Sequence, residues 1–111
     1  MKAFSNIKPA SIQYLGNNTS YINFDIEEIN GVFKYTSLLI NGDVTYERVV
    51  LTLIREKYSQ DDEFALNLKS MQLYFNNCTE EQRAKWIQEI KAFTDYREQC
   101  IDKAKDICNL Q

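Results

Sequence analysis

The chain has 111 residues, which is the length of one domain and excludes a second independent hydrophobic core. Seven tyrosines, six phenylalanines and one tryptophan give it enough apolar bulk to fold, so the composition excludes a disordered chain. The net charge of −3 is spread along the sequence without a basic cluster, and no apolar run reaches the length of about eighteen residues needed to span a membrane. We therefore expect neither nucleic acid nor a membrane as a partner.

The first predicted part, residues 1–42, is rich in β-structure and contains every glycine and the one proline of the chain. Asn30-Gly31 lies between two strand-like runs and predicts a two-residue type I′ turn, which needs positive φ at both positions. An uninterrupted register from this turn places Ile22 opposite Leu39 and their side chains on one face. A third strand is predicted over residues 11–15. The sequence thus predicts an antiparallel hairpin or a three-stranded sheet.

Residues 43–78 are predicted to form two helices, because the apolar period changes from two to about 3.6 after the last glycine. Asp43 or Thr45 can cap the first helix. A new capping sequence begins at Ser59, and the acidic residues that follow it complement a helix N-terminus. The second helix carries an apolar face made of Phe64, Leu68, Met71 and Phe75.

Residues 79–111 are predicted to form one long amphipathic helix that starts at a capping box on Thr79. Its stripe repeats at alternating intervals of four and three residues, as in a coiled coil. The members of the stripe are Trp86, Ile90, Phe93, Arg97, Cys100, Ala104 and Ile107. One interpretation is that this helix packs across its own sheet and forms a hairpin with the second helix. The other is that it overhangs, because thirty helical residues span about 45 Å whereas the radius of gyration expected for the chain is about 13 Å. The predicted fold class is α+β, in a single domain over residues 1–111.

The chain offers no candidate catalytic site. It contains no histidine, which removes the most common general base and most zinc sites. Two of the paired carboxylates, Asp61-Asp62-Glu63 and Glu80-Glu81, lie at predicted helix starts, where the helix dipole accounts for them. The third pair, Glu27-Glu28, lies beside the hairpin turn with its side chains on opposite faces. The three cysteines, Cys78, Cys100 and Cys108, have no metal-binding spacing, and their odd number indicates thiols in a reducing compartment. We expect no enzyme activity, no metal, no cofactor and no small-molecule substrate.

Two segments resemble a known class of protein. The segments are TYERVVLTLIREKYSQDDEFAL (residues 45–66) and YREQCIDKAKDI (residues 96–107). Both are similar to modules in small proteins of tailed phages and prophages of Bacteroides-type hosts, crAss-like phages among them. The resemblance implies an accessory structural or adaptor protein that docks on a capsid, neck, tail or fibre. It would be made in the host cytoplasm, since the start of the chain has no apolar signal segment, and would reside in the virion.

The expected partners are proteins, either further copies of this chain or other virion components. The candidate interface residues are those of the long helix and three tyrosines of the β-rich part, since tyrosine supplies rigid contact area with a polar tip. They are Trp86, Ile87, Ile90, Phe93, Arg97, Ile101, Ile107, Tyr14, Tyr21 and Tyr35. The alternative function is a small acidic phage-encoded inhibitor that blocks a host protein.

Overall fold

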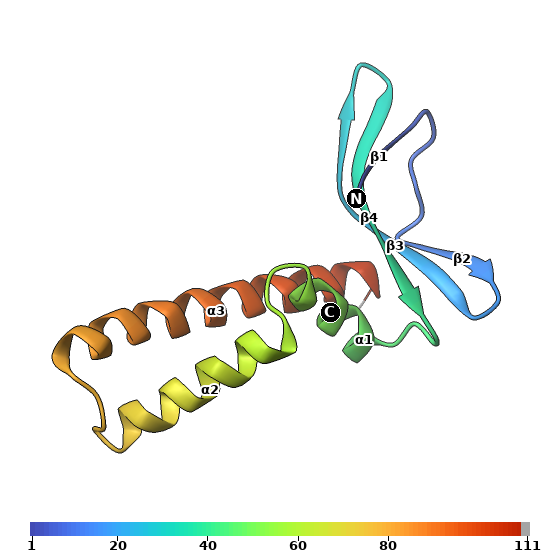
Figure 1. The fold of residues 1–111 in the computed structure, drawn as a ribbon. Helices are drawn as coiled ribbons and strands as arrows, with labels where there is room; N and C mark the ends of the chain where they lie inside the picture. The colour runs from blue at the N-terminus through green and yellow to red at the C-terminus, as the bar shows by residue number, and fades with distance from the viewer. Residues whose placement is uncertain (110–111) are drawn as a thin grey trace. The chain divides into compact units, whose positions relative to one another are not determined.

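The computed structural model describes residues 1–109, in which a four-stranded antiparallel sheet precedes three helices (Figure 1). The elements are β1 Lys2–Ser5, β2 Ile12–Gly16, β3 Thr19–Ile29, β4 Val32–Asn41, α1 Tyr46–Arg55, α2 Gln60–Tyr74 and α3 Glu80–Ile107. The predicted α+β class is confirmed, with one strand more than the three expected. The prediction that the last helix extends to residue 111 includes positions 110 and 111, which lie outside the described residues.

The chain divides into two compact units. The first comprises Met1–Thr52 together with the chain from Ile101 onwards, and the second comprises Leu53–Cys100. The sheet belongs entirely to the first unit and α2 entirely to the second, whereas α1 and α3 contribute residues to both.

The sheet of the first unit has the strand order β1-β4-β3-β2, so that β1 and β2 form its edges. The predicted turn is confirmed, because Asn30 and Gly31 both adopt positive φ, 52° and 82°, and Ile29 lies opposite Val32. The predicted third strand is confirmed as β2, which two further left-handed asparagines connect to β3. Strand β1 was not predicted. It is only four residues long and is fixed by pairing with β4, which is remote in sequence.

A β-bulge interrupts the hairpin and corrects the predicted register. Between Phe24 and Glu27, strand β3 has one more residue than β4, and Asp25 in this stretch adopts a left-handed φ of 52°. Beyond the bulge Ile22 lies opposite Leu38, so the predicted pairing of Ile22 with Leu39 is wrong. Aspartate adopts the left-handed conformation more readily than most non-glycine residues, but no local sequence pattern shows where in a strand it will do so.

The core of the first unit is apolar with a small polar network at one point. Its buried apolar residues are Ile22, Leu38, Ile40, Val49, Ala104 and Ile107. The amide of Asn23, which is only 2% exposed, donates to the Ala10 carbonyl at 2.8 Å and accepts from the Ser37 hydroxyl at 2.8 Å. Both polar ends of the Asn23 side chain are therefore satisfied, as burial requires.

All three helices begin at the residues that the sequence predicts. Thr45 Oγ1 accepts a hydrogen bond from the Arg48 amide at the start of α1. Ser59 and Asp62 form a reciprocal capping box at α2, in which the backbone and side chain of Ser59 lower the pKa of the Asp62 carboxyl. Helix α3 begins with the corresponding exchange between Thr79 and Gln82. Local chemistry is sufficient to set these boundaries.

In the second unit, α2 and the first part of α3 run side by side in opposite directions (Figure 1). Lys69 Nζ on α2 pairs with Glu89 Oε2 on α3 at 2.6 Å. The Tyr58 ring, at the connection between α1 and α2, packs against the rings of Phe93 and Tyr96. Within residues 1–109, no helix has the length and apolar character required to cross a membrane.

Candidate functional site

Much of the predicted α3 stripe packs inside the second unit. The Phe93 ring meets the Tyr58 ring edge-on, with 4.9 Å between centroids. Trp86 and Ile90 are half-buried. Phe93 therefore packs within the second unit, against the connection that leads into α2.

The remaining predicted residues of α3 differ in exposure. Ile107 is buried in the first unit, and Ile101 is half-buried. Arg97 is exposed, and Ile87 exposes half of its surface. Ile87 borders a shallow depression at the turn from α2 to α3, together with Cys78.

The three predicted tyrosines do not lie on one face of the sheet. Tyr14 projects from edge strand β2 and is 73% exposed, opposite Ser20. Tyr21 follows Ser20 on β3 and therefore points to the other face, because successive side chains alternate across a strand. Tyr35 on β4 is half-buried and shares its face with Leu39, the residue opposite Tyr21.

The apolar face that the sequence predicts on the second helix is exposed. The exposed fractions are 63% for Phe64, 45% for Leu68, 56% for Met71 and 70% for Phe75 at the C-cap. We call these four residues the outer face of α2. No residue of the entire helix is buried, although fifteen residues form it.

The opposite side of α2 is the one that meets α3. Leu66 and Leu73 are half-buried there, and Lys69 makes its ion pair with Glu89. Helix α2 is thus apolar on two opposite sides, a pattern typical of helices that are covered on both. The sequence contains the pattern of the outer face, but it could not show that these four side chains remain exposed among the described residues.

The outer face of α2 also lacks charge. Between Glu63 and Glu80 the only side chain that is charged at neutral pH is Lys69, and its ammonium is engaged on the other side of the helix. The centres of protein–protein interfaces are depleted in charged residues and enriched in phenylalanine, tyrosine and methionine. The outer face has this composition.

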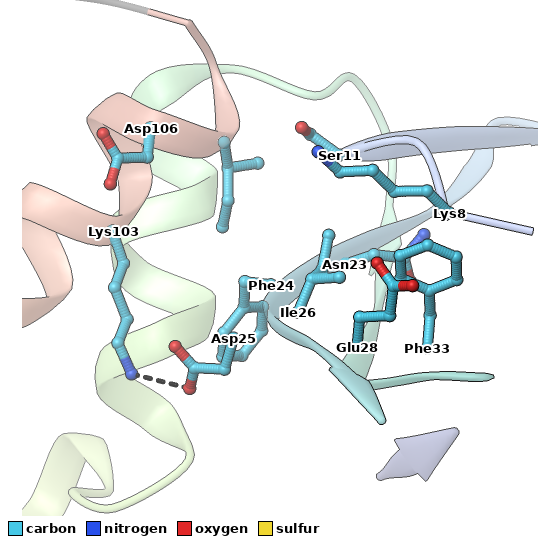
Figure 2. Close-up of a pocket in the computed structure, with 11 residues that line it drawn as sticks. Lys8, Ser11, Asn23, Phe24, Asp25, Ile26, Glu28, Phe33, Lys103 and Asp106 are labelled. Carbon is cyan, nitrogen blue, oxygen red and sulfur yellow. Dashed lines mark hydrogen bonds and ion pairs between the residues drawn. The ribbon is translucent and has the colours of Figure 1, made fainter. Parts of the chain in front are cut away.

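An open depression of about 520 Å³ lies in the first unit beside the bulge (Figure 2). The bulged residue Asp25 pairs with Lys103 Nζ at 3.0 Å, and the same ammonium lies 5.4 Å from the centre of the Phe24 ring. An ion pair this exposed contributes at most about 1 kcal/mol. Asn23 lines the depression with its amide already satisfied. The ion pair links the last turns of α3 to strand β3. Among the described residues, no buried side-chain nitrogen or oxygen lacks a hydrogen-bond partner.

All three cysteines are thiols, with Cys100 buried and Cys78 and Cys108 half-buried. Burial, and to a lesser extent the charge of Glu47, raise the pKa of the Cys108 thiol. Within residues 1–109, no group of three or more acidic, cysteine or histidine side chains is close enough to hold a metal ion.

One titratable group in the second unit links pH to stability. The Tyr96 hydroxyl donates to the Leu53 carbonyl at 2.9 Å, and its burial, together with Cys100, raises its pKa from 10.0 to about 12. The folded protein therefore keeps the phenol proton at pH values where the unfolded chain has lost it. We expect the contribution of the Tyr96 phenol to the free energy of unfolding to be complete below pH 10 and to be lost as the pH rises towards 12.

Tyr96→Phe should lower the free energy of unfolding by about 1 kcal/mol at neutral pH, because it removes the hydrogen bond to Leu53. It should also reduce the loss of stability at alkaline pH. Urea titrations at a series of pH values measure both effects, with Tyr74→Phe as the control that removes an exposed hydroxyl. An equally steep alkaline loss in Tyr96→Phe and in the wild type would contradict the assignment.

Comparison of the chain with family models, with curated proteins and with solved structures found no match.

Proposed function

We propose that this chain is a non-enzymatic accessory protein of a tailed-phage virion, which acts as an adaptor through protein–protein contacts. The observation that carries the proposal is α2, a fifteen-residue helix that buries none of its residues and exposes an uncharged apolar face. Exposed apolar patches of several hundred Å² on small proteins are commonly interaction sites. The similarity of residues 45–66 and 96–107 to small phage proteins supports the virion as the place of that interaction.

The chemistry of the outer face favours an adaptor over the alternative, an acidic inhibitor of a host protein. An inhibitor that imitates nucleic acid needs a continuous acidic surface, whereas the outer face has no charged residue. Virion assemblies are built from small modules repeated by symmetry, and such modules expose apolar surface until they dock. The outer face of α2 suits that role.

The proposal is tested by quantitative mass spectrometry of particles from a phage that carries this gene. The protein should copurify with the particles at a constant ratio to the major capsid protein through successive density gradients. Leu68→Lys, at the centre of the outer face, should reduce this ratio at least tenfold. Ser70→Lys, which adds the same charge to an exposed position off that face, should leave it unchanged.

Two results would contradict the proposal. One is a protein that is abundant in infected cells and absent from purified particles. The other is recovery of the protein in a stoichiometric complex with a single host protein, which would support the inhibitor instead.

A further inference from the structure

The outer face of α2 is symmetric along its own length. Its four residues are separated by intervals of four, three and four, and this spacing is the same in both directions. The chemical types are also symmetric, with a phenylalanine at each end and an unbranched or γ-branched aliphatic side chain at the two inner positions. A helix face with both properties matches a second copy of itself placed antiparallel about a two-fold axis.

We infer that the outer face of α2 is an antiparallel, two-fold interface between two copies of this chain. Phe64 of one copy then packs against Phe75 of the other, and Leu68 packs against Met71. Intervals of four and three are those of interdigitating side chains in paired helices. The inference rests on the proposed function, since it names one partner of the same interaction surface.

The exposed area is sufficient for a pair. With about 200 Å² for a whole aromatic side chain, the two phenylalanines together expose about 250 Å² per copy. Leu68, Met71 and the neighbouring Tyr74, which is 85% exposed, bring the patch to about 600 Å² on the same scale. Two copies would bury about 1,200 Å², the lower limit for specific protein–protein interfaces.

The charges at the end of α2 favour the antiparallel direction. Asp61, Asp62 and Glu63 form an acidic first turn, and a parallel pair would place two such turns side by side. In an antiparallel pair the two turns are separated by most of a fifteen-residue helix, about 20 Å, which is beyond the screening length of about 8–10 Å. The outer face itself carries no charge, so it offers nothing that would attract a highly charged partner.

The test uses sedimentation of the full chain over a range of concentrations. The wild type should form a dimer, and Leu68→Lys and Met71→Glu should each weaken dimerisation at least tenfold, because each places a charge twice in the apolar interface. Ser70→Lys is the matched control and should dimerise as the wild type does. Circular dichroism spectra of the variants, compared with that of the wild type, establish that each remains helical.

Mixing the two variants tests the direction of the pair. The antiparallel pair has two equivalent contacts between position 68 of one copy and position 71 of the other. In the mixed pair one of these contacts joins Lys to Glu, and the other keeps the native Leu and Met. An equimolar mixture of Leu68→Lys and Met71→Glu should therefore dimerise more strongly than either variant alone. A parallel pair aligns each position with itself, so in the mixture each charge would face an apolar side chain. The mixture would then gain only the relief of like-charge repulsion, and its dimerisation would stay far below that of the wild type.

Three outcomes would overturn the inference. They are a wild type that remains monomeric at millimolar concentration, a dimer that persists in both variants, and a mixture that does not recover. The proposed function is assessed separately by incorporation into particles. A monomeric wild type that still copurifies with particles would disprove self-pairing and leave the adaptor role in place.

Discussion

Replacement of Asn23 by leucine is expected to lower the free energy of unfolding by about 2–4 kcal/mol. Leucine has a similar shape but no polar atoms, so the Ala10 carbonyl would lose the amide that bonds to it and the Ser37 hydroxyl would lose its acceptor. Asn23 is 2% exposed and Ser37 is 8% exposed, so water does not readily replace either bond. The larger side chain also has to fit a site that the amide already fills.

The matched variants are Ser37→Ala and the double variant with Asn23→Leu. Ser37→Ala should cost about 1–2 kcal/mol, because it leaves the Asn23 carbonyl oxygen without its hydroxyl donor. The double variant should cost less than the two single changes together by at least about 0.5 kcal/mol, since the two groups interact directly. Chemical denaturation of the four proteins measures these values. Strictly additive effects would show that the hydrogen bond between the two side chains contributes little.

The features that the sequence predicted correctly are those that depend on neighbouring residues. The turn at Asn30-Gly31 needs only two residues that accept positive φ, and the starts of α2 and α3 need only a hydroxyl and a carboxylate or amide three positions apart. The apolar side of α1 also follows from its period, with Val49, Leu53 and Ile54 all buried. Such signals lie within a single turn or helix, so a single sequence contains them.

The features that were not predicted depend on residues distant in the chain. Strand β1 becomes a strand because Lys2–Ser5 finds the edge of β4, some thirty residues away. The bulge at Asp25 selects one of two possible registers between β3 and β4. The bulged residue pairs with Lys103, which lies 78 residues further along the chain. Neither pairing leaves a local pattern that distinguishes it from the alternatives.

The candidate interaction surface shows the same division. The spacing of Phe64, Leu68, Met71 and Phe75 is visible in the sequence, and so is the stripe of α3. Which of the two faces is covered depends on the contacts of the folded hairpin: Phe93 on α3 packs against Tyr58, whereas the four side chains of the outer face of α2 are all exposed. Periodicity identifies apolar faces, but only the packing identifies the one left for a partner.

Leu38→Ala should lower the free energy of unfolding by about 2–4 kcal/mol, whereas Leu39→Ala should lower it by less than about 1 kcal/mol. The two leucines are adjacent and chemically identical, but they point to opposite faces of β4. Leu38 is 8% exposed and lies opposite Ile22, which is fully buried; Leu39 is 49% exposed. Truncation at position 38 leaves a cavity in the core, and truncation at position 39 removes a side chain that is half in water.

The comparison of these two variants tests the bulge directly, because an unbulged hairpin requires the reverse order. Without the extra residue between Phe24 and Glu27, Leu39 would lie opposite Ile22 in the core and Leu38 would face outwards. Thermal and urea unfolding of the two alanine variants decide between the registers. A greater loss of stability in Leu39→Ala than in Leu38→Ala would place β3 and β4 in the uninterrupted register. A greater loss in Leu38→Ala instead requires the bulge at the left-handed Asp25. The bulge shifts the pairing of β3 with β4 by one residue and so places Leu38, in the core, opposite Ile22.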